Sequence, residues 1–363
     1  MEKDEEKDLA WYEEAAEQGD AGAQFRCGWM YYYGDGTAAD KEQALYWFEK
    51  AAQQGDAEAQ CNCGLMYYKG EGTVADKEKA LCWFEKAAEQ GVAEAQRDCG
   101  LMYYHGEGSA ADKGKALYWF EKAARQGDAE AQYNCGVMYS KGEGTTADKV
   151  KSLYWYETAA GQGHKSAQYN CGWMYYHGEG TAADKEKALF WFEKAAEQGD
   201  ESAQCYCGLM YTKGEGAAED REKALYWYEK AAQQGHAEAQ FQCGLRYFWG
   251  VLGGGTEIDT DKAFLWYERA ARQGHAEAQC RYGRMYDTGR GTEKDKAQAL
   301  YWYEKAAEQG VAEAQYKCGR MYCTGEGAAE DRAKAKLWLQ KAAEQSENEY
   351  ARKEAEKLLR EYF

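Results

Sequence analysis

Apolar residues along this chain recur at the spacing of helices rather than of strands. Between residues 56 and 91, Ala59, Cys63 and Met66 lie four and three residues apart, which places them on one stripe of a helix. A second stripe in the same stretch consists of Ala80, Trp83, Ala87 and Ala88. No run of β-branched residues alternates with polar ones, so the pattern predicts helices and no strand.

Glycines mark where these helices should end. Gly70 and Gly72 separate the two stripes, and Gly91 follows the second one. Glycine is common just after a helix because it adopts the left-handed backbone without strain. Asp76, or the threonine three residues before it, is a suitable N-cap for a helix that runs to about Gln90. The stretch therefore predicts a hairpin of two short helices.

This hairpin recurs through the chain with a fixed period. The glycine of a Gln-Gly step returns every 36 residues, with a single spacing of 39. Its positions are Gly19, Gly55, Gly91, Gly127, Gly163, Gly199, Gly235, Gly274 and Gly310. A tryptophan keeps the same period at Trp11, Trp47, Trp83, Trp119, Trp155, Trp191, Trp227, Trp266, Trp302 and Trp338. Neither helix can bury its stripe alone, so successive hairpins should stack and share a core.

Several residues recur in nearly every hairpin. In the stretch 56–91 they are Ala59, Gln60, Gly64, Tyr67, Gly70, Gly72, Asp76, Lys79, Ala80, Trp83, Lys86, Ala87, Ala88, Gln90 and Gly91. This pattern resembles the Sel1-like repeat family, a relative of the tetratricopeptide repeats, and the resemblance implies an α/α solenoid that works as an adaptor in protein assemblies. We predict an all-α, right-handed superhelical solenoid. It has a capping helix in 1–18, nine repeats in 19–345 with the irregular spacing in 235–274, and a capping helix in 346–363.

The composition and charge of the chain argue against several classes of function. The chain has no proline, 15% aromatic residues and a net charge of −18. A helical array tolerates proline at few sites, and the acidic balance disfavours nucleic acids, whose phosphates require a basic footprint. No run of 18 apolar residues suggests a membrane span, and the acidic start lacks the apolar segment of a secretory signal. We therefore expect no nucleic-acid partner, no membrane insertion and a monomer.

The chain has thirteen cysteines, which could in principle form disulfides or bind a metal ion. Eight of them occupy one first-helix position: Cys27, Cys63, Cys99, Cys135, Cys171, Cys207, Cys243 and Cys318. Successive first helices stand about 10 Å apart or more, whereas a disulfide requires Cα atoms within about 7 Å. A cysteine-rich branch of the resembled family has a second cysteine in the other helix, where this chain has only Cys82. We predict buried free thiols, no metal, no cofactor and a reducing compartment, the cytoplasm; a secreted or periplasmic location would apply if a signal segment had been removed.

The Gly-Glu-Gly step between the helices could suggest a phosphate loop. No strand precedes it, no Gly-Lys-Ser/Thr follows, and the central glutamate, such as Glu71, would repel an anion. No Ser/His/Asp or Cys/His set appears either, and repetition gives no unique site. We predict turns here and no enzymatic activity.

Candidate binding residues come from differences between the repeats. With 100° per residue, the Phe25 and Trp29 positions point away from the stripe of Ala23, Cys27 and Met30, and both vary along the chain. In the resembled family the first helix lines the concave surface, so aromatic residues there are candidates for partner binding. They are Phe25, Trp29, Tyr133, Tyr169, Trp173 and Phe241. The alternative is that these residues pack between adjacent first helices.

Four cations extend this surface toward the C-terminus. Arg281 and Lys317 share one repeat position, and Arg284 and Arg320 share another. Guanidinium groups on two neighbouring repeats suit an acidic motif or a peptide C-terminus. Ordinary ion pairs with nearby glutamates are the alternative.

These observations predict a non-catalytic scaffold or adaptor that holds a peptide or protein partner in the groove. A glycan-binding or peptidoglycan-binding module is the alternative, since the aromatic residues could stack on sugar rings. The irregular repeat carries three extra residues within Trp249–Gly255, and we expect Val251 and Leu252 to dock on the next repeat or to touch a partner.

Overall fold

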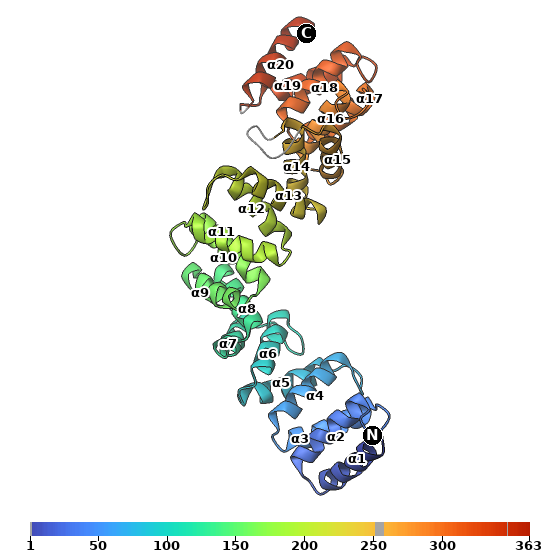
Figure 1. Cartoon of the computed structure of the whole chain (residues 1–363), viewed down its shortest axis with the longest axis vertical. Helices are drawn as coiled ribbons and strands as arrows, with labels where there is room; N and C mark the ends of the chain where they lie inside the picture. Colours follow the sequence, from blue (N-terminus) through green and yellow to red (C-terminus); the bar gives the residue numbers. More distant parts are fainter. Residues whose placement is uncertain (1, 251–257, 347) are drawn as a thin grey trace. The chain divides into compact units, whose positions relative to one another are not determined.

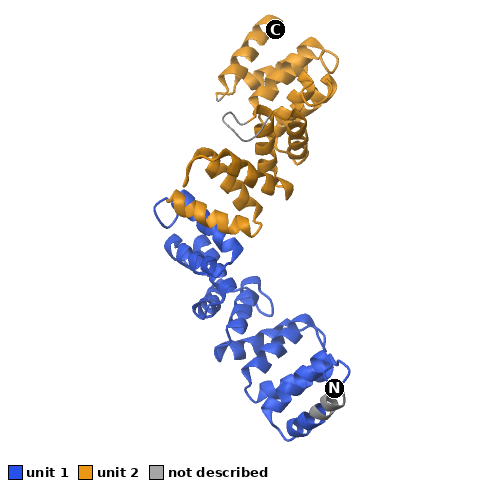
Figure 2. Cartoon of the chain, in the orientation of Figure 1, with its two compact units in different colours: residues 1–183 blue, residues 184–363 orange. Residues whose placement is uncertain are grey.

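The computed structural model describes residues 2–250, 258–346 and 348–363, with side chains from residue 9 onward. These residues form twenty helices and no strand, as the sequence pattern predicts. Contacts divide the chain into two compact units, residues 1–183 and 184–363 (Figures 1 and 2). Neighbouring helices along the chain pack as antiparallel hairpins within each unit.

Unit 1 (residues 1–183) contains α1 to α10. Helix α1 (Glu2–Glu17) packs against α2, the first helix of the first hairpin. The first helices are α2 (Ala21–Tyr33), α4 (Ala57–Lys69), α6 (Ala93–His105), α8 (Ala129–Lys141) and α10 (Lys165–His177). The second helices are α3 (Lys41–Gln53), α5 (Lys77–Glu89), α7 (Lys113–Arg125) and α9 (Lys149–Gly161).

Unit 2 (residues 184–363) continues the same alternation. Its first helices are α12 (Glu201–Lys213), α14 (Ala237–Trp249), α16 (Ala276–Thr288) and α18 (Ala312–Thr324). Its second helices are α11 (Lys185–Glu197), α13 (Arg221–Gln233), α15 (Thr260–Arg272), α17 (Lys296–Glu308) and α19 (Arg332–Ala343). Helix α20 (Glu349–Tyr362) packs against both α18 and α19.

The helix ends use the predicted residues. Asp76 caps α5, since its Oδ1 accepts a hydrogen bond from the Lys79 amide at 3.0 Å. Gly70 ends α4 with φ of +73°. A Cβ on Gly72 would lie 2.1 Å from the carbonyl oxygen of Lys41, so this turn lies directly against the start of the preceding second helix. The Gly-Glu-Gly step is therefore a turn that joins neighbouring hairpins.

The predicted first-helix stripe forms the core. Ala59, Cys63 and Met66 are buried, and a Cβ on Gly64 would lie 2.6 Å from the ring of Phe84. The absence of a side chain at this glycine lets the two helices of one hairpin approach closely. Among the tryptophans that recur with the repeat, Trp11 on α1 is an exception, because 63% of its surface is exposed.

Buried cysteines behave as small apolar residues in this core. The eight cysteines of the first-helix column are all buried. Burial, followed by the charge of Glu13, raises the pKa of the Cys27 thiol to about 11, so this thiol stays protonated at neutral pH. Protonated thiols are poor nucleophiles and poor metal ligands.

Two hydrogen-bond ladders join the hairpins, and neither follows from hydrophobic periodicity. Gln60 donates to the Ala52 carbonyl oxygen at 3.0 Å, and its own side-chain oxygen accepts from Gln90 at 2.8 Å. On another face, the Tyr67 hydroxyl donates to Glu49 at 2.6 Å. The same pairs recur in other repeats, so each joint satisfies the same buried polar groups.

The irregular repeat is described on both sides of its insertion. Val251 and Leu252 lie outside the described residues, so the prediction that they dock on the next repeat or touch a partner is untested. In the same repeat, Arg246 replaces the usual methionine; its guanidinium stacks over the Tyr228 ring at 4.4 Å, and it donates to the hydroxyl of Thr212. The arginine thus joins two hairpins instead of filling the core.

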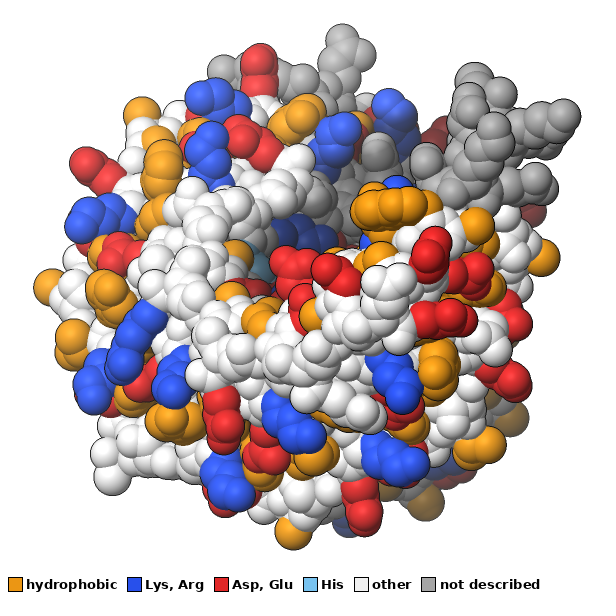
Figure 3. Space-filling view, turned by 90° about the horizontal axis from the view of Figure 1, so that it is seen from below, with side chains coloured by type: hydrophobic (Ala, Val, Ile, Leu, Met, Phe, Trp, Pro, Cys, Tyr) orange, Lys and Arg blue, Asp and Glu red, His pale blue; other side chains and the backbone are white. Residues whose placement is uncertain are grey.

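No helix within the described ranges is long and apolar enough to cross a membrane. On the face that Figure 3 shows, Lys and Arg side chains are interspersed with Asp and Glu side chains.

Candidate functional site

The first-helix surface is defined here by four positions of each first helix, those of Phe25, Arg26, Trp29 and Tyr32. Phe25 and Trp29 are half-buried on α2. The Phe25 ring lies 5.7 Å from Phe48 of α3, and Trp29 lies 5.3 Å from the same ring. Trp29 also stacks on the exposed Tyr33 at 5.3 Å. These two residues rest on the core and still keep one side toward solvent.

Two predicted binding residues are instead covered by the next hairpin. The ring of Tyr133 stacks on His164 at 4.6 Å, and Phe241 is buried and stacks on His275 at 4.7 Å. Both histidines are N-caps, because their Nδ1 atoms accept from backbone amides of α10 and α16. Packing between adjacent first helices, the alternative from the sequence, therefore describes these two positions.

The remaining aromatic candidates lie on α10. Tyr169 and Trp173 are half-buried, and the Trp173 ring lies 4.1 Å from that of His177. Their role in partner binding stays a prediction.

A trough crosses the first-helix surface of unit 1 between α4 and α6. It encloses about 470 Å³, and its lining includes Leu65, Tyr68, Phe84, Asp98, Leu101 and His105. A smaller space of about 90 Å³ next to it is lined by Trp29, Tyr33 and Phe48, and shares Leu65 and Lys69 with the trough. Apolar walls with a few polar groups are typical of sites that take a side chain or a small ligand.

A half-buried carboxylate, that of Asp98, lies in the wall of this trough. Burial raises the pKa of Asp98 to about 6, against the opposing charge of Arg97. Arg97 contacts Asp98 at 3.3 Å, and it also pairs with Asp128 at 3.0 Å. The equivalent residues in neighbouring repeats are Asn62 and Asn134, so the charge is particular to this hairpin.

Glu107, the central residue of a Gly-Glu-Gly turn, closes one end of the trough. It accepts a hydrogen bond from Tyr68 at 2.7 Å and pairs with Lys77. Lys77, followed by Tyr68, lowers the pKa of Glu107. The glutamate therefore holds two consecutive hairpins together.

In unit 2 the same surface is cationic. Arg281 and Arg284 approach Glu313 at 3.5 and 3.6 Å, and Arg320 approaches Asp287 at 3.7 Å. The ion pairs that the sequence left as an alternative thus occur for three of the four cations. Lys317 has no ion pair within 4.0 Å among the described residues, which leaves it the least satisfied of the four.

Tyr267 and Tyr303 lie beneath these cations and were not predicted from the sequence. Both side chains are buried, and neither hydroxyl has a hydrogen-bond partner among the described residues. The equivalent residues of α3, α5 and α7 are Phe48, Phe84 and Phe120. The sequence signal that could have pointed to these hydroxyls is the change from phenylalanine to tyrosine at this repeat position.

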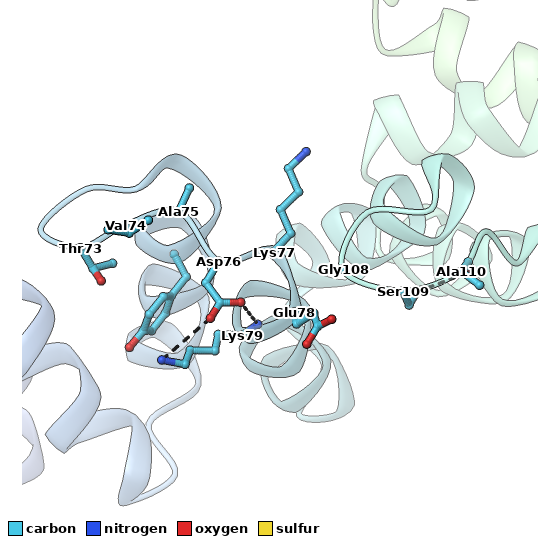
Figure 4. A pocket seen from close by; sticks show the side chains of 11 residues that line it. Thr73, Val74, Ala75, Asp76, Lys77, Glu78, Lys79, Gly108, Ser109 and Ala110 are labelled. Carbon is cyan, nitrogen blue, oxygen red and sulfur yellow. Dashed lines mark hydrogen bonds and ion pairs between the residues drawn. The ribbon is translucent and has the colours of Figure 1, made fainter.

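Another depression lies away from the first-helix surface. It encloses about 750 Å³ beside the turns 73–79 and 108–110 (Figure 4). The Asp76 carboxylate caps α5 and pairs with Lys79 at 3.9 Å, while Lys77 points out of the depression. The polar groups here serve the turn itself.

Within the described part of the chain, no group of three or more His, Cys, Asp or Glu side chains is arranged to hold a metal ion.

The repeat geometry agrees with a comparison against known families. The sequence profile of the Sel1 repeat matches ten consecutive segments: 1–20, 21–56, 57–92, 93–128, 129–164, 165–200, 201–236, 237–275, 276–311 and 312–347. The chain belongs to the Sel1 repeat family. The match confirms the resemblance seen in the sequence, and the 39-residue segment contains the insertion.

Solved Sel1 repeat structures are similar over most of the chain. A protective antigen present in uropathogenic Escherichia coli strains is 32% identical with a TM-score of 0.70, and the match covers 98% of this chain and 83% of the antigen. A Sel1 repeat protein from Oxalobacter formigenes is 34% identical with a TM-score of 0.66, covering 86% of this chain and 90% of that one. The comparison with curated proteins gave no match.

Proposed function

We propose that this Sel1 repeat chain is a non-catalytic scaffold that holds a peptide or protein partner on the first-helix surface of unit 1. The trough between α4 and α6 carries the proposal, because a space of about 470 Å³ beside apolar side chains suits an anchor side chain of a partner. The smaller space beside Trp29 extends the same surface along the neighbouring helix.

The columns that line this trough are the ones that vary between repeats. Leu65 and Leu101 correspond to Trp29 and Val137 in adjacent hairpins, whereas the core positions hardly change. Surface variation on a constant scaffold favours recognition of a partner over a purely structural role.

A peptide library displayed on phage and selected against the full chain tests this proposal. The enriched peptides should share an apolar anchor and bind the purified chain. Leu65→Glu combined with Leu101→Glu should weaken them at least about tenfold, because charges would line the trough. Leu245→Glu, at the same repeat position on α14, is the matched control and should leave binding unchanged. Peptides that bind the double variant as well as the native chain would contradict the proposal.

The glycan alternative has a weaker basis in the structure. Trp29 and Trp173 already have ring partners on their own helices, Tyr33 and His177. A sugar would have to displace or extend those contacts to stack on either indole.

A further inference from the structure

Eight charged side chains gather on α16, α17, α18 and the turns beside them. The cations are Arg281, Arg284, Lys296, Lys317 and Arg320, and the anions are Asp287, Glu313 and Glu326. Two more positive than negative charges are present in this cluster, although the whole chain carries −18. An excess of like charge at one place is costly unless something of opposite sign reduces it.

The internal carboxylates satisfy these guanidiniums only in part. Glu313 lies 3.5 Å from Arg281 and 3.6 Å from Arg284, and Arg320 lies 3.8 Å from Glu326. Charge-assisted hydrogen bonds are usually about 2.7–2.9 Å long. The Nε atoms of Arg281 and Arg320 are buried without a hydrogen-bond partner among the described residues. The cluster therefore retains donors that an added acceptor could use.

Lys317 is the second sign of an incomplete site. Burial, followed by the charge of Arg320, lowers the pKa of this lysine. It makes no ion pair within 4.0 Å in the described part of the chain, although Asp287 and Glu313 influence its charge from farther away. A bound anion would offset the repulsion from the neighbouring arginines.

The tyrosine hydroxyls beneath the cations are an independent observation. The Tyr303 side chain is 0% exposed and that of Tyr267 is 1% exposed, and neither hydroxyl has a partner among the described residues. Burial raises the pKa of both hydroxyls, and the charges of Arg281 and Arg284 oppose that rise at Tyr267, as the charge of Arg284 does at Tyr303. A buried hydroxyl without a partner is expensive, so two of them next to partly satisfied arginines indicate a place built for an acceptor.

We propose that this cluster on α16 and α18 binds carboxylates of an acidic peptide segment in a protein partner. Glu313 already places a carboxylate between two guanidiniums, which shows that the planar group fits there. Neighbouring first helices lie about 10 Å apart. Two glutamates three residues apart span about that distance in a polyproline II peptide, which rises about 3.1 Å per residue and, with three residues per turn, places both side chains on one face. The proposal rests on the proposed function, since the ligand belongs to a protein partner, but it concerns a separate site.

The test measures binding of a fluorescein-labelled, C-terminally amidated peptide, Gly-Ser-Glu-Gly-Ser-Glu-Gly-Ser, to the full chain by fluorescence anisotropy. The same peptide with glutamine at both positions is the ligand control. The glutamate peptide should bind at least about tenfold more tightly than the glutamine peptide. Arg284→Gln combined with Arg320→Gln should remove most of that difference.

Glu313 provides a variant that should strengthen binding. Glu313→Gln removes the carboxylate that now competes for the guanidiniums, so affinity for the glutamate peptide should rise about threefold or more. Glu277→Gln changes the equivalent residue one repeat earlier, where the side chain is exposed, and should have no effect. A general change in net charge would act equally in both variants.

Folding is checked by circular dichroism, and Lys317→Met provides a second loss of positive charge if the double arginine variant is unstable. Equal binding of the two peptides, or no binding to either the native chain or Glu313→Gln, would overturn the proposal. Displacement by inorganic phosphate at the concentration of the peptide itself would also overturn it, because the site would then select phosphate. The outcome is independent of the unit 1 trough, which the Leu65 and Leu101 variants test separately.

Discussion

The first-helix surfaces of the two units have the same backbone and opposite chemistry. In unit 1 the positions on α4 and α6 carry Leu65, Leu101 and the half-buried carboxylate of Asp98 around a trough of about 470 Å³. In unit 2 the positions equivalent to Leu101 and Asp98 carry Arg320 and Lys317. The hairpins are held by aspartate caps, helix-ending glycines and the glutamine ladder in both units. Surface recognition can therefore change at a few positions without any change in the fold.

The packing beneath the first-helix surface also differs between one hairpin of unit 1 and one hairpin of unit 2. A Cβ on Gly100 of α6 would lie 2.6 Å from the Phe120 ring, whereas the atoms nearest to a Cβ on Gly283 of α16 would be the Ala299 carbonyl oxygen at 3.1 Å and Tyr303 at 3.2 Å. A Cβ on Gly244, also in unit 2, would lie 2.6 Å from Tyr267, so the extra room belongs to the hairpin of α16 and α17. Substitutions at matched positions can show whether this difference has energetic consequences.

The largest expected effect is that of alanine at Gly100 and Gly283. Overpacking costs about 1–3 kcal/mol, while alanine gains about 1 kcal/mol in helix propensity over glycine. Gly100→Ala should therefore lower the free energy of unfolding by up to about 2 kcal/mol, and Gly283→Ala should leave it nearly unchanged. Urea denaturation followed by circular dichroism measures both. Equal losses would show that the two hairpins pack alike.

Asp98→Asn should stabilise the chain, and the gain should depend on pH. The folded-state pKa of about 6 lies above the usual value of 3.8, so ionisation opposes folding. The native carboxylate costs little below about pH 4, where it is protonated in both states. Its cost grows between about pH 4 and pH 6 and is constant above that range. The variant should gain about 1–2 kcal/mol at pH 7 and little at pH 4.

Asn134→Asp provides the reverse experiment on α8. The new carboxylate should destabilise the chain at pH 7 and not at pH 4. A gain for Asp98→Asn that is the same at both pH values would mean that the ionised carboxylate is fully compensated by Arg97.

A smaller effect is expected where the tyrosine ladder differs between the units. Tyr103 donates to Glu85, whereas the equivalent Tyr286 lies 3.3 Å from the hydroxyl of Tyr282. Tyr103→Phe should cost about 1 kcal/mol because it leaves a carboxylate without its donor, and Tyr286→Phe should cost less than half as much. Thermal melting of both variants at equal protein concentration decides the order.

Periodicity was sufficient to predict the hairpins, their turns and the buried stripe. Asp76, Gly70 and Cys63 each occupy the environment that their repeat position predicted. The right-handed superhelix and the boundaries of the capping segments stay predictions. Local spacing specifies which face of a helix is apolar, and that face must be covered by a neighbour.

The candidate site could be predicted only in part, since a single-helix projection contains no neighbouring hairpin. Tyr133 and Phe241 point away from their own stripe, and yet the histidine N-cap of the next hairpin covers each ring. The cations were correctly found to be neighbours, but the unpartnered hydroxyls of Tyr267 and Tyr303 depend on depth, which spacing does not give.

The glutamine contacts that recur from joint to joint have a consequence for how such chains change length. Each hairpin presents the same donors and acceptors on its leading edge as the hairpin before it, for example Gln60 and Gln96 toward Ala52 and Ala88. Excision or duplication of one whole 36-residue segment, such as 57–92, would rejoin complementary edges and leave no buried amide unmatched. A gene of this kind can grow or shrink by entire modules while its product remains able to fold.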